Sequence, residues 1–135
     1  MKHKAHYSKD NFSSFGVLFK LSFTVELDPP SSKKMMESFV RSMALKYTNR
    51  ADFDIVRIKT FLKSLTGHIK ADLTGVKKEV FTESVMKNGM KQGKLAVNIV
   101  AQGLSEEEAK NIVIEALKET LNPLSGRFST IREST

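Results

Sequence analysis

A long run of alternating apolar and polar residues constrains the fold of this chain more than any other feature. The apolar residues recur at every second position, and only Leu18 interrupts the pattern: Phe15, Val17, Phe19, Leu21, Phe23, Val25 and Leu27. A period of two is typical of a β-strand that buries one face and exposes the other. The pattern therefore predicts a long strand from Phe15 to Leu27.

A break and then a helix follow this strand. Asp28-Pro29-Pro30-Ser31-Ser32 combines two prolines with capping residues, which end a strand and begin a helix. We expect the helix to run from about Ser32 to Tyr47. Its apolar residues recur at helical spacing and include three methionines, which favours packing against a core: Met35, Met36, Phe39, Val40, Met43 and Tyr47.

Residues 52–66 allow two interpretations. Ile55, Val56, Ile58 and Thr60 favour a strand by composition. The spacing favours a helix, because only Val56 lies outside one apolar arc at about 100° per residue, which consists of Ile55, Ile58, Phe61, Leu62 and Leu65. An alternating strand would place Arg57 and Lys59 in line with Phe61, which makes a poor buried face. We therefore predict a helix and keep the strand as the alternative.

The second half of the chain predicts three strands in a meander and a closing helix. His68–Thr74 alternates, Val76–Met86 is rich in Val, Phe and Thr, and a returning strand follows the hairpin signal Asn88-Gly89. Ser105 with Glu108 forms a capping box. The apolar face of the helix that it begins consists of Ala109, Ile112, Val113, Ala116, Leu117 and Leu121.

These elements predict the α+β class. Hairpin-linked strands form an antiparallel sheet, here of about four strands, and amphipathic helices must cover one of its faces. The expected order is β-α-α-β-β-β-α, with 52–66 as the uncertain element. The chain has 135 residues, which suits one domain. We assign residues 1–12 to a mobile basic arm, 13–123 to the domain and 124–135 to a polar tail.

Composition and motifs argue against several functional classes. The chain has no cysteine, which excludes thiolate catalysis and cysteine-ligated metal sites. His3 and His6 have no companion ligands, and His68 has no partner that would make it a general base. We expect no metal, no cofactor and no enzymatic activity. No stretch is typical of a signal peptide or a membrane span, so we expect a cytoplasmic location.

Positive charge is concentrated in the middle of the chain. The net charge is +7, and residues 33–94 carry fourteen basic and six acidic groups. We predict a basic patch that contacts a polyanion, with RNA or DNA as the expected partner. The aromatic residues mostly fall on apolar faces, so we expect contact with the backbone and shape of the nucleic acid. The candidate residues are Arg50, Arg57, Lys59, Lys63, Lys70, Lys77 and Lys78.

A different functional class follows from a resemblance. The strand Phe15–Leu27 with Asp28-Pro29-Pro30, and the closing helix Ser105–Leu121, resemble in their order the START/Bet v 1-like helix-grip group. This resemblance implies a cavity between sheet and last helix that holds an apolar small molecule. Its lining would be Met35, Met36, Phe39, Met43, Val113 and Leu117. A third hypothesis is a self-associating protein that binds no small ligand.

Overall fold

The alternating segment forms β1, which spans Phe12–Leu27 and lies inside an antiparallel sheet. The structure is a computed structural model that describes residues 12–50, 57–74 and 79–134. The remaining elements are α1 (Pro29–Arg50), β2 (Arg57–Ser64), β3 (Gly67–Thr74), β4 (Val80–Met86), β5 (Met90–Gln102), α2 (Glu106–Leu121), the 3-10 helix η2 (Asn122–Leu124) and β6 (Gly126–Ser134).

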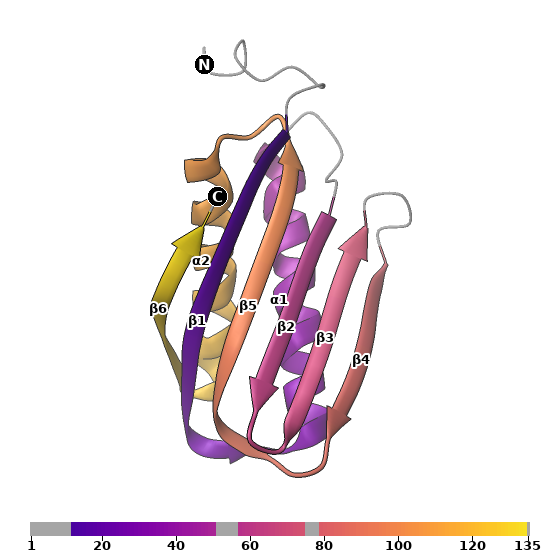
Figure 1. The fold of residues 1–135 in the computed structure, drawn as a ribbon, viewed down its shortest axis with the longest axis vertical. Helices are drawn as coiled ribbons and strands as arrows, with labels where there is room; N and C mark the ends of the chain where they lie inside the picture. The colour runs from indigo at the N-terminus through magenta and orange to yellow at the C-terminus, as the bar shows by residue number, and fades with distance from the viewer. Residues whose placement is uncertain (1–11, 51–56, 75–78, 135) are drawn as a thin grey trace.

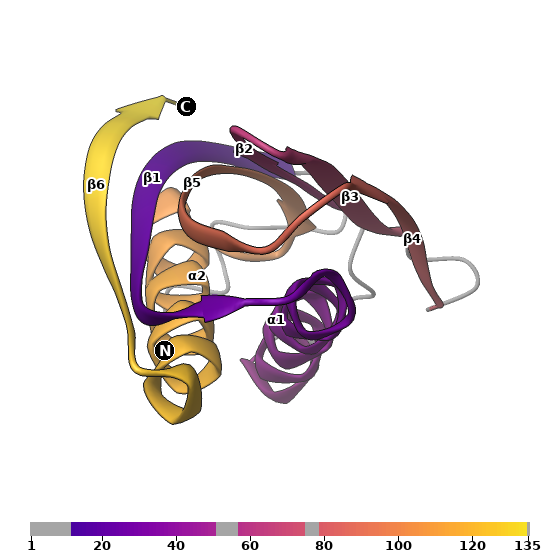
Figure 2. The same ribbon diagram turned by 90° about the horizontal axis from the view of Figure 1, so that it is seen from below.

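The strands form one six-stranded sheet in the order β4-β3-β2-β5-β1-β6, and every neighbouring pair is antiparallel (Figure 1). The sheet is curved, and both helices lie on its concave side (Figure 2). The predicted α+β class, with helices on one face of an antiparallel sheet, is confirmed. The other, convex face carries no helix of the described chain.

Local capping positions both helices. Asp28 precedes α1 and its Oδ1 accepts a hydrogen bond from the backbone N–H of Ser31 at 2.8 Å. Hydrogen bonds from the side chain and the backbone of Ser31 lower the pKa of Asp28. The predicted capping box of α2 is present, because Ser105 Oγ accepts from Glu108 N–H and Glu108 Oε1 accepts from Ser105 N–H. Both helix starts thus have partners for free backbone N–H groups.

The core lies between the concave face of the sheet and the two helices. Inward residues of the strands pack against the apolar faces of α1 and α2. Tyr47 extends this packing to the end of α1, where its hydroxyl donates to the carbonyl of Gln102 and accepts from the N–H of the same residue. The largest fully buried side chains are Tyr47, Phe19, Phe39, Leu21, Met36, Met43, Ile58, Leu62, Ile69, Leu95, Ile99 and Leu104.

The helix predicted over 52–66 is wrong for its described part. Residues 57–64 form β2, in which Ile58, Thr60 and Leu62 are buried and their neighbours are exposed. The helical arc counted Phe61 and Leu65 as core, but they are 40% and 105% exposed. When these two residues are left out of the core, the buried residues of this segment recur at every second position. Residues 52–56 lie outside the described part of the chain.

The predicted meander is also wrong in its pairing. β4 pairs with β3, but β5 pairs with β2 and β1 instead of with β4. Asn88-Gly89 therefore belongs to a crossover that passes the β2–β3 turn. Thr66 holds this crossover, because its hydroxyl donates to the carbonyl of Asn88 at 3.0 Å and its carbonyl accepts from Lys87 N–H.

The third correction concerns the end of the chain. Most of the predicted tail, 124–135, is ordered, because Gly126–Ser134 forms β6 along the edge of β1. This strand and β2 raise the predicted number of strands from about four to six. Phe128 on β6 packs edge to face against Phe19, with the ring centroids 5.4 Å apart. Residues 1–11 of the predicted arm lie outside the described residues.

Candidate functional site

The convex face of the sheet, called here the outer face, is the surface that the helices leave open. In Figure 1 it is turned toward the viewer. Residues paired across antiparallel strands point to the same side of a sheet, with Cβ atoms about 4.5–5.5 Å apart. The strand register therefore shows which side chains are neighbours on this face.

Three lysines lie side by side across the centre of the outer face. Lys63 on β2 is paired with Lys94 on β5, and Lys94 is paired with Lys20 on β1. All three are exposed. Among the described residues, none of the three forms an ion pair with an acid. We call Lys20, Lys63 and Lys94 the lysine row.

Other basic side chains surround the lysine row on the same face. Arg57 and Lys59 precede Lys63 on β2, and Lys70 lies on β3 opposite Phe61. Arg127 and Arg132 lie on β6, opposite Ser22 and Leu18. The registered pairs place two acids there, Asp72 and Glu83. Asp72 lies 3.7 Å from Lys70, so the positive charge of this face is only partly balanced.

An exposed aromatic ring lies beside the lysine row. Phe61 is 40% exposed and stacks on His68, with ring centroids 5.2 Å apart and an angle of 25° between the planes. A depression of about 150 Å³ adjoins the ring. Its lining consists of Lys59, Thr60, Phe61, Lys70, Asp72, Ala96 and Asn98. The outer face therefore combines cations, an aromatic surface and hydrogen-bonding groups within a few residues.

The structure brings together four of the seven basic residues predicted from the sequence. Arg57, Lys59 and Lys63 share the outer face of β2, and Lys70 lies on neighbouring β3. Arg50 is the last residue of α1 and so belongs to the helical layer. Lys77 and Lys78 lie outside the described part of the chain.

Sequence reasoning missed half of this surface. Lys20 and Lys94 occupy polar positions of alternating strands, so alternation already directed them away from the core. The order of the strands could not be predicted, and the predicted meander did not place β5 between β2 and β1. Arg127 and Arg132 were assigned to a tail, and Phe61 was assigned to the core.

The residues predicted for an apolar pocket are part of the packed core. Met35 is 4% exposed and the other five are between 0% and 1% exposed: Met36, Phe39, Met43, Val113 and Leu117. Of the six, Met35 lines an open groove of about 450 Å³ that is bounded by α1, α2 and η2. Helix–sheet packing alone accounts for the burial of these side chains.

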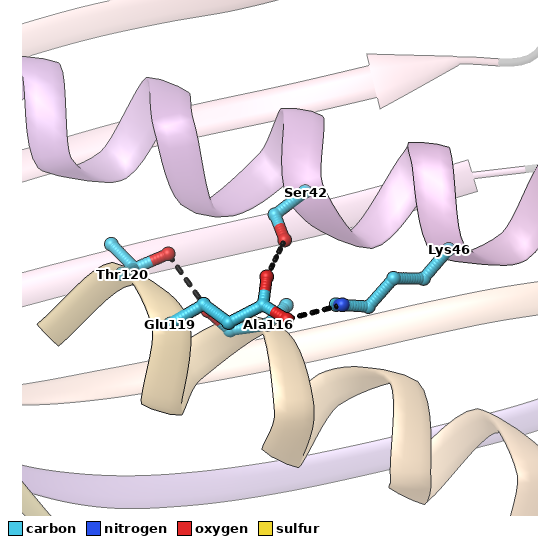
Figure 3. A network of polar contacts seen from close by, with 5 residues as sticks. All are labelled: Ser42, Lys46, Ala116, Glu119 and Thr120. Atoms are coloured by element: carbon cyan, nitrogen blue, oxygen red, sulfur yellow. Dashed lines mark hydrogen bonds and ion pairs between the residues drawn. The ribbon is translucent and has the colours of Figure 1, made fainter. Parts of the chain in front are cut away.

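The helical layer differs electrostatically from the outer face. Lys46 on α1 and Glu119 on α2 are 2.7 Å apart, and Ser42 donates to the same carboxylate at 3.3 Å (Figure 3). The hydrogen bond from Lys46 lowers the pKa of Glu119. Lys110 on α2 likewise lies 3.1 Å from Glu133 on β6. Lys46 and Lys110 on this side therefore have acidic partners, whereas the lysine row has none in the described chain.

We expect the lysine row to reduce the stability of the free protein. Like charges opposite each other in a sheet are unfavourable, so Lys94→Thr should raise the free energy of unfolding by several tenths of a kcal/mol, up to about 1 kcal/mol. The gain should shrink as added salt screens the charges. Urea unfolding at low and high salt measures both effects.

The matched control is Lys91→Thr, an exposed lysine on the same strand that lies outside the row. It makes the same chemical change at a lysine that has no place in the row. The repulsion among the three lysines of the row remains, so stability should stay nearly unchanged. Equal effects of the two substitutions, or a loss of stability in Lys94→Thr, would contradict the interpretation of the row.

Comparisons with known proteins do not identify a family. No family model matches the chain, and no curated protein matches it. One similar solved structure is the Zn(II)-bound YjiA GTPase from E. coli, at 15% identity and a TM-score of 0.39. The match covers 78% of this chain and 29% of that chain. A likeness this distant carries no argument about the function of this protein.

Two further observations concern other classes of site. Within the described residues, no group of three or more metal-ligating side chains is placed to hold a metal ion. Neither α1 nor α2, the two α-helices that the structure describes, is both long and apolar enough to cross a membrane.

Proposed function

We propose that this protein binds nucleic acid on the outer face of the sheet, by contacts with the phosphate groups of the nucleic acid. The observation that carries this proposal is the lysine row. Three cations on adjacent strands repel one another in the free protein, and this repulsion becomes attraction when phosphates lie between them.

The surroundings of the row support a polyanion as the ligand. Arg57, Lys59 and Lys70 extend the positive surface over β2 and β3, and Arg127 and Arg132 extend it to the β6 edge. Such a spread of charge exceeds what a single small anion requires. A chain of phosphates contacts several of these groups at once, and each contact releases a counterion.

The rigidity of the face favours binding as well. The lysines and arginines project from hydrogen-bonded strands, so their backbones need no ordering when a ligand arrives. The inward neighbours Ile58, Leu62 and Leu95 anchor the same strands in the core. The proposed interface is therefore preorganised at the level of the backbone, and only the long side chains lose freedom on binding.

Salt dependence tests this proposal directly. If four to six phosphates are contacted, the logarithm of the association constant should fall with the logarithm of salt concentration with a slope of about −3 to −4 for a single strand. Fluorescence anisotropy of a labelled oligonucleotide at several salt concentrations measures the slope. A slope near zero, or no binding at low salt, would refute phosphate contact as the basis of function.

A further inference from the structure

We infer that the outer face binds an unpaired nucleobase stacked on Phe61, and that it therefore selects single-stranded over duplex nucleic acid. This inference rests on the proposed function and adds the substrate class. It depends on three features of the surface beside the lysine row: the exposed ring, the depression next to it and the curvature of the sheet.

Among the described side chains, Phe61 is one of two exposed phenylalanines on the outer face, and the other, Phe81 on β4, lies opposite Asp72. Phe61 projects from the wet face of β2 between Lys59 and Lys63, and it lies opposite Lys70 on β3. With 40% of the residue exposed, the ring contributes little to the core. Stacking on His68 supports one side of the ring and keeps it oriented. An exposed, oriented ring among cations is the arrangement that stacks bases while cations hold the backbone.

The depression beside Phe61 has room for one six-membered ring. Ala96 lies opposite Phe61 on β5, and its small side chain leaves the space open. The volume is about 150 Å³, and a cavity of about that size accommodates a single benzene ring. The amide of Asn98 and the carboxylate of Asp72 line the same space. An amide and a carboxylate can pair with the hydrogen-bonding edges of a base.

The shape of the face favours a flexible ligand. The outer face is the convex side of a curved sheet (Figure 2). A duplex is stiff, with a persistence length of about 50 nm, so it meets a convex surface over a short length. Its bases are also paired and stacked inside the helix, where Phe61 cannot reach them. A single strand can follow the curvature from the lysine row to the depression and place one base on the ring.

Substituting Phe61 tests the inference by two separate readouts. Phe61→Leu keeps an apolar side chain but removes the flat ring. We expect its affinity for ten-nucleotide oligo-dT and oligo-U to fall by roughly 5- to 100-fold, while its affinity for a duplex of equal length stays unchanged. A loss of affinity for either oligonucleotide supports the inference, and the ratio of the two affinities shows whether the protein prefers DNA or RNA. Phe81→Leu, an exposed aromatic on β4 that does not line the depression, is the control and should bind as the natural protein does.

The second readout reports stacking itself. The chain contains no tryptophan, so Phe61→Trp introduces a single indole at the proposed contact. Single strands should quench its fluorescence, and duplexes should not. Equal affinity for single strands and duplexes, unchanged single-strand affinity in Phe61→Leu, or an unquenched indole would overturn the inference. Salt-dependent binding in those same titrations would still support the proposed function, whereas absence of any binding at low salt would refute both.

Discussion

Replacing Lys20, Lys63 and Lys94 together by glutamate should abolish binding of oligonucleotides, with a loss of at least about 100-fold near 100 mM salt. The substitution removes three phosphate contacts and places three repelling charges at the centre of the outer face. Three adjacent glutamates repel one another as the three lysines do, so the free energy of unfolding should change little. Anisotropy titration measures the affinity, and thermal unfolding checks the fold.

A variant of the helical layer separates the position of the charges from their number. Lys33, Lys34 and Arg41 are exposed on α1, and their replacement by glutamate causes the same change in net charge, from +7 to +1. We expect this variant to keep most of its affinity, because its charges lie behind the sheet. Equal losses in the two variants would show that overall charge governs binding and that the lysine row has no special role.

Gly67→Ala should destabilise the fold by at least about 2 kcal/mol. Gly67 opens β3 with φ = +148°, a region that residues with a Cβ rarely adopt. A Cβ there would lie 1.9 Å from the carbonyl oxygen of Val85, which is backbone on the paired strand β4. Either β3 or β4 must move, and the β3–β4 pairing weakens. Urea unfolding measures the loss.

Gly93→Ala is the matched control for this substitution. A Cβ at Gly93 would meet Leu62 Cδ1 at 3.1 Å and the carbonyl oxygen of Lys63 at 3.2 Å, so shifts of a few tenths of an ångström suffice. We expect its stability to change by less than about 1 kcal/mol. If the two alanine variants were equally stable, the close approach of β4 to Gly67 would not be a determinant of the fold.

Local patterns predicted the elements that carry a strong period or a complete cap. The strand over Phe15–Leu27 and the capping box at Ser105 each follow from a few neighbouring residues, and both are present. The alternation ends early, because the register shifts after Ser22, and Val25, predicted to be buried, is 68% exposed. The pairing of β5 with β2 and β1 depends on contacts between distant residues, so no local signal reported it. Asn88-Gly89 is compatible with a tight hairpin and with the crossover that the structure contains.

The candidate site was predictable only in part, for a related reason. Arg57, Lys59 and Lys63 share the exposed face of β2. They were predicted to share an exposed face, but that of a helix. Phe61 misled the assignment, since an apolar residue at helical spacing from Ile58 and Leu65 suggests core. Its exposure next to the cations is the feature that favours single-stranded nucleic acid as the ligand.

Lysine footprinting tests the central claim most directly, because it reports on the proposed contacts themselves. Sparse acetylation of the protein with and without oligo-dT, followed by mass spectrometry, compares the reactivity of each amine in the two states. Binding on the outer face predicts protection of Lys20, Lys63 and Lys94, with Lys33, Lys34 and Lys118 in the helical layer as reactive as in the free protein. Protection of the helical lysines, with the three on the sheet left reactive, would contradict the account.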